Sequence, residues 1–538
     1  MEQKWKSRIA YIALFCVWAV LLCGCSNRQE QEMPLTEISG LPEEVTLTEM
    51  PDVPTGTPIP SPSLAPSATE IPESTPVPSP SSTPTPTVMP TCTPTPVITD
   101  PYDGRFWIGK YAEDTALLLT QEQIKEQNDK NYRATGTKLV VLSERKVYTA
   151  GEVLGMIEEY QLPVRKYLDN KEFGTAEKEA LLQERKLSVL RDNAAREIVP
   201  ECGILISNTD VRSFPTAKRL TSEVQGRFDY LQETRLLIGE AVLVLHRSED
   251  GLWCFVQAEN YCGWIRESAI AYCTRDELCA VTETMADVEN GKLAVVTKNG
   301  MYHIGEEDIY LRMGTRFLCA DLERYGKKTN QIINVQNEET VTIILPRRGA
   351  DGLIVWEEEN VSAVDAEGER CIVTGYLPYT RANIMRLAVR LLGAPYAWGD
   401  APSFGAEISK AGDNGMDCSS TVAAVFRCFG FVLPRNTGTQ RKMDCAKQEL
   451  SALGTGQRRE ALDRMRGGEL LYTSGHVMLY LGTADGEYYV LHNTSTEARD
   501  DGGKDEFYRC VITTMGLGKK GQTILERLIQ RNTLFPID

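Results

Sequence analysis

The chain has 538 residues, and its 75 acidic side chains outnumber the 58 basic ones, which gives a formal net charge of −17. Such an excess of negative charge argues against nucleic acid as a partner and against binding anionic wall polymers through bulk attraction. The 15 cysteines and four histidines show no spacing typical of a metal site, so we expect neither a metal ion nor another cofactor.

Residues 1–25 have the layout of an export signal. Basic residues at positions 4, 6 and 8 precede an apolar run over residues 9–22, which is short for a span of the bilayer. The run ends in LCGC at residues 22–25. This resembles a bacterial lipoprotein signal, in which the cysteine after the small residue is lipidated. We therefore expect Cys25 to anchor the chain to the membrane, with the rest outside the cytoplasm. A short transmembrane anchor is the alternative.

Residues 26–100 are rich in proline, threonine, serine and glutamate, and 15 of the chain's 27 prolines fall between Pro51 and Pro96. A segment of this composition cannot bury a core, so we expect a disordered linker. At about 3.1 Å per residue it would reach on the order of 200 Å when extended. The sequence does not decide whether this linker is glycosylated.

Residues 101–202 show helical patterns. The run Thr120-Gln121-Glu122-Gln123 has the form of a helix start with a capping box. Residues 150–160 and 175–190 have helical spacing and pairs of opposite charges. We expect a helical N-terminal domain over residues 101–202.

Two strand-rich stretches follow. Residues 203–275 resemble a bacterial Src-homology-three-like barrel, with DVRSFP at 210–215 as its opening motif and GWI at 263–265 as its closing motif. Residues 276–375 contain further strand patterns, and we expect a second, diverged barrel there. Cys254 and Cys262 flank a predicted hairpin and are candidates for a disulfide.

A helix is predicted to begin at Cys418. Apolar residues at positions 422, 425, 426 and 429 have helical spacing, and Gly430 follows as a stop signal. Asp417 supplies the N-terminal cap. At a helix start the unpaired N–H groups and the helix dipole favour a thiolate, so we expect the thiol pKa to fall from about 8.5 into the range of about 3.5 to 7.5. Cys418 is therefore predicted to be a nucleophile.

The segment from His476 to His492 has the alternation of a β-hairpin, with Asp485-Gly486 in its turn. If the turn centres near Ala484, the two histidines lie almost opposite each other across the strands. A slip of one residue in this register would place them on opposite faces. With the thiol packed on the same sheet, the order Cys, His, His provides a nucleophile, a base and a group that orients the base.

The motifs around these residues, in order, are LGAPYAWGD, MDCSS, FGFVLPRNTGTQ, GGELLYTSGHVMLYLG and VLHN. Together they resemble the NlpC-type cell-wall peptidases, a papain-like cysteine peptidase family, over residues 376–538. The resemblance implies that Cys418 is the nucleophile, His476 the general base and His492 the residue that orients it. It implies that Tyr396 helps to form the oxyanion site, and that Asp417 and Ser419 bind the terminal amine of a stem peptide.

Several positions depart from the family pattern. The usual second glycine after Trp398 is Asp400, the glycine after Cys-Ser is Ser420, and an expected aspartate is Glu469. These departures put the shape of the pocket in doubt more than the activity. Nearby, Trp398 is expected to be a packing residue rather than a substrate contact. Two further polar residues are expected in a solvated loop, with substrate contact as the alternative: Arg435 and Gln440.

The resemblance implies an α+β fold, with a papain-like catalytic domain behind one or two small barrels and a helical N-terminal stabilising region. The barrels would bind peptidoglycan or wall one side of the cleft, or serve only as spacers. We expect a monomeric, lipid-anchored cysteine endopeptidase that cuts peptidoglycan stem peptides between γ-D-glutamate and the diamino acid. The alternatives are an N-acetylmuramoyl-L-alanine amidase and a non-catalytic wall-binding lipoprotein.

Overall fold

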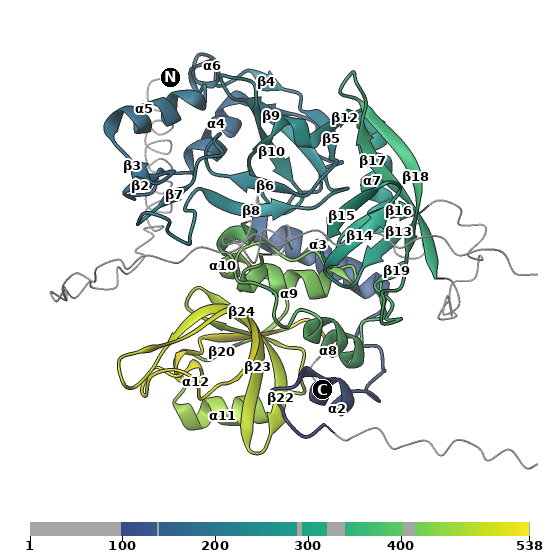
Figure 1. The fold of residues 1–538 in the computed structure, drawn as a ribbon, viewed down its shortest axis with the longest axis vertical. Helices are drawn as coiled ribbons and strands as arrows, with labels where there is room; N and C mark the ends of the chain where they lie inside the picture. The colour runs from purple at the N-terminus through teal and green to yellow at the C-terminus, as the bar shows by residue number, and fades with distance from the viewer. Residues whose placement is uncertain (1–97, 137–138, 288–292, 320–338, 402–414, 537–538) are drawn as a thin grey trace, which may run out of the picture. The chain divides into compact units, whose positions relative to one another are not determined.

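The computed structural model of the chain describes residues 98–136, 139–287, 293–319, 339–401 and 415–536. The predicted export signal with Cys25 and nearly all of the predicted linker, residues 26–97, lie outside the described residues. The described residues belong to one compact unit, Thr93–Asp538 (Figure 1). No helix among them is long and apolar enough to cross a membrane.

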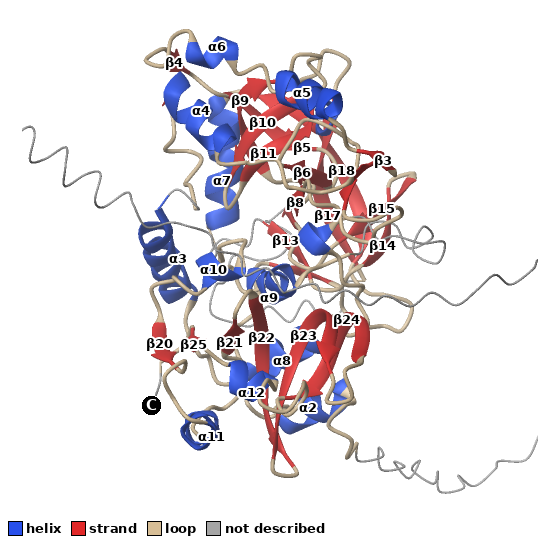
Figure 2. Cartoon of the chain, turned by 90° about the vertical axis from the view of Figure 1, so that its left-hand side faces the viewer, coloured by secondary structure: helices blue, strands red, loops and turns tan. Residues whose placement is uncertain are grey.

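The C-terminal part of the chain forms a six-stranded antiparallel sheet in the order β20-β25-β21-β22-β23-β24 (Figure 2). The strands are β20 (Ala446–Glu449), β21 (Leu470–Thr473), β22 (His476–Ala484), β23 (Glu487–Ala498), β24 (Lys504–Thr514) and β25 (Gln530–Thr533). Helix α9 (Cys418–Arg427) packs against β22 and β23, and α8 (Arg381–Val389) packs against α9. The remaining elements are η3 (Trp398–Asp400), α10 (Thr437–Gln440), α11 (Thr455–Asp463) and α12 (Ile524–Arg527). The predicted packing of a helix-borne cysteine on an antiparallel sheet is confirmed.

Helix α9 forms where its apolar spacing predicts it. Val422, Val425 and Phe426 are buried in one core with apolar residues of α8 and β22. Burying a side chain of this size contributes about 1.5–3 kcal/mol. The helix starts with a capping box in which the Asp417 carboxylate accepts from the Ser420 amide at 2.9 Å. Gly430 then takes a positive φ of 94° just beyond the last turn.

A seven-stranded antiparallel sheet in the order β12-β5-β9-β10-β11-β6-β8 occupies the region of the first predicted barrel. Its strands are β5 (Glu201–Leu205), β6 (Thr209–Arg212), β8 (Gln232–Leu236), β9 (Ala241–Arg247), β10 (Trp253–Ala258), β11 (Cys262–Arg266) and β12 (Ile270–Cys273), with η2 (Glu267–Ala269) before the last. The register pairs Cys254 with Ile265 and Cys262 with Gln257. The candidate Cys254–Cys262 disulfide is not formed: the two residues are not opposite each other, and both thiols are free.

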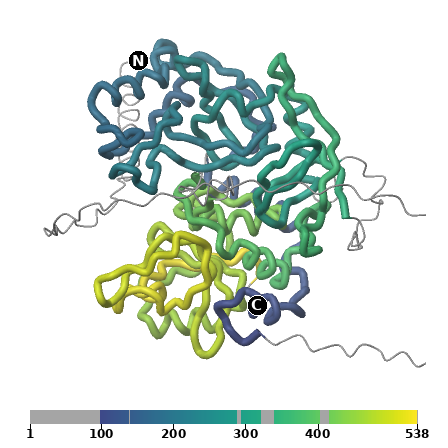
Figure 3. The backbone as a smooth tube through the Cα atoms, in the orientation of Figure 1, coloured from purple at the N-terminus to yellow at the C-terminus, as the bar shows by residue number. Residues whose placement is uncertain are grey.

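A second, five-stranded sheet in the order β18-β17-β16-β13-β19 follows the helix α7 (Arg275–Ala286). It contains β13 (Leu293–Val296), β16 (Arg316–Cys319), β17 (Thr340–Arg348), β18 (Ile354–Ser362) and β19 (Ile372–Thr374), and a separate hairpin is formed by β14 (Gly300–Ile304) and β15 (Glu307–Leu311). The chain path through β17 and β18 is a long hairpin (Figure 3). Phe317, Ile343 and other apolar residues give this sheet a core of its own.

The N-terminal helices are divided between two cores. Trp107 of α2 (Gly104–Lys110) and Ile124 of α3 (Gln121–Thr135) are buried in the core around α9, whereas Val153 of α4 (Ala150–Glu158) is buried with the barrel. The predicted capping box at Thr120 is confirmed. The pattern over residues 175–190 is two helices, α5 (Thr175–Glu184) and α6 (Ser188–Arg191). Short strand pairs complete the region: β1 (Tyr148–Thr149) with β4 (Glu197–Ile198), and β3 (Lys171–Glu172), β2 (Tyr167–Leu168) and β7 (Leu220–Thr221).

Candidate active site

Cys418 is the first residue of α9 and is buried, with 8% of its surface exposed. Its sulfur lies 3.7 Å from Thr437 Oγ1, and the Val477 amide donates to it. Burial raises the pKa of the Cys418 thiol to about 11, and the neighbouring Asp417 carboxylate adds to the rise. The expected fall of this pKa is therefore wrong. The helix start is present, but burial and the adjacent negative charge outweigh its effect.

His476 and His492 are in direct contact. His476 Nε2 lies 2.8 Å from His492 Nδ1, and His492 Nε2 lies 3.0 Å from Thr513 Oγ1. If each imidazole donates its Nε2 proton along this chain, Nδ1 of His476 is left as a free proton acceptor. Burial lowers the pKa of His476 to about 4, with a further decrease from Arg527, and burial also lowers that of His492 well below its usual range. Both rings are therefore neutral at neutral pH.

A β-bulge places the two imidazoles on one face of the sheet. The turn at Asp485-Gly486 pairs Ala484 with Glu487, and in that register His476 and His492 would face opposite sides. Leu481 is an extra residue between the pairs of Tyr480 with Val490 and Gly482 with Tyr489. The register therefore shifts by one residue. The histidines become diagonal neighbours, not the nearly opposite pair that a turn near Ala484 would produce.

The bulge is contacted by the end of helix α2, which lies near the N-terminal limit of the described residues. The Tyr111 hydroxyl donates to the carbonyl of Leu481 at 2.8 Å. Gly482 has a φ of 128°, and a Cβ built there would lie 2.8 Å from the Tyr111 hydroxyl and 3.2 Å from the Trp107 ring. A glycine is therefore required beside the bulge, because both the backbone conformation and the close approach of α2 exclude a side chain.

Tyr396 lies on a short segment whose backbone bridges to Met416, two residues before Cys418. Burial, the Cys418 thiol and the Asp417 carboxylate all raise the pKa of its hydroxyl. The hydroxyl therefore stays protonated and remains a hydrogen-bond donor. The ring of Phe228, from the loop before β8, stands edge-on to Tyr396 with 6.2 Å between centroids.

Asp417 and Ser419 lie in a saturated polar cluster. Asp417 accepts two hydrogen bonds from Arg435, at 3.1 and 2.7 Å, and one from the Ser419 hydroxyl at 2.9 Å. Burial alone would raise the pKa of the Asp417 carboxyl, but Arg435 and the helix-start donors lower it. Arg435 is 6% exposed and Gln440 is completely buried. The expectation of a solvated loop is therefore wrong, because both side chains bind groups around the start of α9.

The barrel reaches this cluster through β8. The Thr234 hydroxyl accepts from Arg435 Nε, and Gln232 donates to the carbonyl of Gly399 at 3.1 Å. Nearby, the Tyr261 hydroxyl donates to Glu233 at 2.6 Å and interacts with the side chain of Asn436. The barrel therefore lines one side of the cluster around Asp417.

Three further residues near the site differ in exposure. Trp398 is 53% exposed, so its interpretation as a packing residue is wrong. Cys428 is buried and Cys445 is partly buried, and burial raises their thiol pKa values to about 12 and about 11, so both thiols are protonated at neutral pH. Asp400 was noted only as a departure from the family pattern, Thr437 lies in a quoted motif without an assigned role, and two site residues carry no local sequence signal: Thr513 and Arg312.

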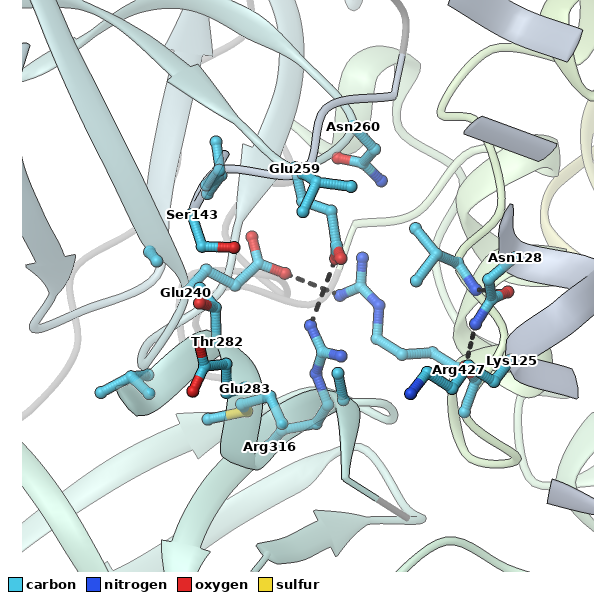
Figure 4. A pocket seen from close by; sticks show the side chains of 18 of the residues that line it. Lys125, Asn128, Ser143, Glu240, Glu259, Asn260, Thr282, Glu283, Arg316 and Arg427 are labelled. Carbon is cyan, nitrogen blue, oxygen red and sulfur yellow. Dashed lines mark hydrogen bonds and ion pairs between the residues drawn. The ribbon is translucent and has the colours of Figure 1, made fainter. Parts of the chain in front are cut away.

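A cavity of about 310 Å³ lies away from these residues, between α3, α7, the barrel and the C-terminal end of α9. Four of its charged side chains form two pairs: Glu240 with Arg427 at 2.9 Å, and Glu259 with Arg316 at 3.5 Å (Figure 4). None of the predicted catalytic residues lines it. Among the described residues, no three His, Cys, Asp or Glu side chains are grouped to hold a metal ion.

Comparisons with known proteins identify a family over the part of the chain that contains Cys418, His476 and His492. A model of the NlpC/P60 family matches residues 393–503, and a model of SH3 domains of the SH3b1 type matches residues 221–266. The chain is 32% identical over 286 residues to the gamma-D-glutamyl-L-lysine dipeptidyl-peptidase of Bacillus subtilis (strain 168), which covers 50% of this chain and 74% of that protein.

The fold also resembles that of a solved NlpC/P60 endopeptidase from Photobacterium damselae subsp. piscicida. The TM-score is 0.60 at 15% sequence identity, and the match covers 82% of this chain and 98% of that one. This likeness concerns the fold alone. It agrees with the predicted α+β class, in which an SH3b-like β region precedes the catalytic domain.

Proposed function

The chain belongs to the NlpC/P60 family of cell-wall peptidases, and on that premise we propose that it is a cysteine endopeptidase cutting peptidoglycan stem peptides between γ-D-glutamate and the diamino acid. The observation that carries the catalytic assignment is the His476–His492 contact of 2.8 Å on the sheet that packs against the Cys418 helix. The proposed catalytic residues are Cys418, His476 and His492.

In the proposed mechanism Cys418 Sγ attacks the carbonyl carbon while His476 Nδ1 takes the thiol proton. The pKa values of about 11 and about 4 make thiol and imidazole the resting forms. The proton is therefore transferred during attack, and His476 then returns it to the leaving amine. Water hydrolyses the acyl-enzyme in a second step. His492 accepts from His476 Nε2 and so holds the tautomer that leaves Nδ1 free.

The proposed oxyanion site has two donors. The Cys418 backbone amide is among the unpaired N–H groups at the start of α9. The Tyr396 hydroxyl is held protonated by its raised pKa. A donor aimed at the developing negative charge contributes more to the transition state than to the ground state, and removing one typically costs on the order of 100-fold in kcat.

We further propose that the polar cluster beside Cys418 receives the free amino end of the stem peptide. Asp417 and Ser419 are buried there, and Arg435 already compensates the Asp417 charge. The barrel adds a second carboxylate, Glu233, held by Tyr261. An ammonium group needs acceptors and negative charge, which this side of the site supplies. The contact of β8 with the cluster supports a barrel that limits how far the substrate extends.

Digestion of defined muropeptides tests the cleavage site. Mass spectrometry of the products should find a new amino terminus on the diamino acid, with stem peptides bearing free L-Ala cut faster than those attached to muramic acid. A new amino terminus on L-Ala would instead identify an amidase. If Cys418→Ala digests the same fragments as the parent, a non-catalytic wall-binding role is the better description.

Acting at the wall requires export. We propose that Cys25 is lipidated and anchors the protein to the extracytoplasmic face of the bacterial membrane. The LCGC run at residues 22–25 supports this proposal. Metabolic labelling with radioactive palmitate should label the parent, whereas Cys25→Ala should remain unlabelled and leave the membrane fraction. Labelling that persists in Cys25→Ala would contradict the anchor.

A further inference from the structure

A buried carboxylate without a role in the proposed chemistry lies beneath the start of α9. Asp400 is 3% exposed and has a left-handed φ of 57°, a conformation that residues other than glycine seldom adopt. Its Oδ1 accepts from the backbone amide of Asp417 at 3.0 Å and from the Ser420 hydroxyl at 2.5 Å. The two departures from the family pattern at positions 400 and 420 are therefore bonded to each other.

A residue that follows the β14–β15 hairpin completes this arrangement. Arg312, directly after β15, is 3% exposed, and its Nη1 lies 3.4 Å from Asp400 Oδ2. Its Nη2 donates to the carbonyl of Gly415, three residues before the nucleophile. One planar guanidinium thus binds both the carboxylate and the backbone that leads into Cys418.

We propose that Arg312 and Asp400 are positioning residues for the Cys418 nucleophile, acting through the backbone of residues 415–417. The proposal rests on the proposed catalytic role of Cys418. Both contacts fix main-chain atoms immediately before the helix, so a shift at either one moves the sulfur relative to His476. An error of about 1 Å in such a position can cost on the order of 100-fold in rate.

The proposal assigns a function to the region between the barrel and the peptidase domain. The barrel contacts the site through Gln232 and Thr234 of β8. The segment after the β14–β15 hairpin contacts it through Arg312. The charges in the cluster balance, since Asp400 and Asp417 face Arg312 and Arg435. The peptidase domain alone would lack one of these four charges.

The test uses the full chain with Arg312→Gln and Asp400→Asn, and Arg348→Gln as the matched control. Arg348 joins the second sheet to Glu267 of the barrel at 2.8 Å and does not contact the site. The first readout is kcat and KM on a stem peptide. We expect kcat to fall by about ten- to 100-fold in both site variants, with KM changed by less than about threefold, because positioning acts on the chemical step. The control should keep the parent values.

The second readout is the alkylation of Cys418 by iodoacetamide from pH 6 to 10, followed on the Cys418 peptide by mass spectrometry. Because the Cys418 pKa of about 11 leaves no plateau in this range, rates are compared at each pH, and a positioning role lowers the rate in both variants throughout. A role through charge alone shifts the thiol pKa in opposite directions, because one variant loses a cation and the other an anion. Alkylation rates that fall in one variant and rise in the other, or an equal loss of kcat in Arg348→Gln, would overturn the proposal.

Two milder variants keep the test decisive if the first pair folds poorly. Arg312→Lys keeps the charge but cannot make both contacts, so it should recover part of the lost kcat. Ser420→Ala removes one donor to Asp400 and should lower kcat by about two- to fivefold. Parent-like kcat in Ser420→Ala and no recovery in Arg312→Lys would overturn the proposal. A parent that alkylates normally but cuts no stem peptide contradicts the proposed substrate, while the alkylation comparison still tests the positioning.

Discussion

The two sides of the α9 start differ in how their polar groups are satisfied. On the sulfur side, Cys418, His476 and His492 are uncharged and make few hydrogen bonds. On the carboxylate side, Asp400, Asp417 and Arg435 form a dense charged cluster. The difference indicates that rigidity and reactivity are separated: the saturated side fixes the backbone, and the other side retains groups that can change protonation during a reaction.

The largest expected effect is the loss of the proposed nucleophile. Cys418→Ala should lower kcat on a stem peptide by at least about 10⁴-fold, because the covalent step has no substitute. Hydrolysis followed by chromatography measures it. Cys428→Ala, on the same helix but against the Val296 carbonyl, should keep near-parent activity. Equal losses in the two variants would mean that helix stability, not sulfur chemistry, limits the rate.

The next largest effect concerns the charged side. Arg435→Met leaves the buried Asp417 carboxylate without its guanidinium partner and removes one of the two cations beside Asp400, and it should destabilise the protein by about 3–5 kcal/mol. Urea denaturation measures the change. The exposed ion pair of Arg499 with Asp501 is the control, and Arg499→Met should not change stability measurably. Equal stabilities for the two variants would remove the contrast between a rigid and a reactive side.

A smaller effect is expected from the orienting histidine. His492→Leu removes the acceptor of His476 Nε2 and should reduce kcat by about 100-fold with little change in KM. Thr513→Val, one contact farther along the chain of hydrogen bonds, should reduce it only about threefold. Steady-state kinetics distinguishes the two. A larger loss in Thr513→Val than in His492→Leu would contradict the proposed order of roles.

The pH dependence of the free thiol sharpens the comparison further. Because the Cys418 pKa is raised to about 11, the thiol is protonated at pH 7. As long as the pH is below this pKa, each increase of one pH unit raises the thiolate fraction about tenfold. Alkylation of Cys418 by iodoacetamide should therefore accelerate from pH 7 to 10 without a plateau. A plateau already at pH 7 would indicate a preformed thiolate and the lowered pKa expected from the helix start alone.

Local sequence patterns predicted the helices and strands well, but they did not predict contacts between residues far apart in the sequence. The start of α9 at Cys418 depends on neighbouring residues, so spacing and capping were sufficient. Arg312 lies more than 100 positions before Cys418 along the chain, and only folding brings its guanidinium to Asp400. Arg435 has the composition of a solvated loop, but its burial is decided by carboxylates that contact it from other elements.

The thiol pKa was missed for a related reason. Helix position is readable from the sequence, but burial and the charge of Asp417 act in three dimensions and have the opposite sign. The family motifs directed attention to Asp417 and Ser419 without indicating that Arg435 already binds both.

The bulge at Leu481 has a consequence for how this hairpin can evolve. Deleting that residue, or inserting one between it and the turn, would place His476 and His492 on opposite faces of the sheet although all the proposed catalytic residues are still present. Changes of hairpin length are therefore tolerated only in steps of two residues. A relative whose β22–β23 hairpin is one residue longer or shorter, without a compensating bulge, would keep the Cys, His, His order but would be expected to lack peptidase activity.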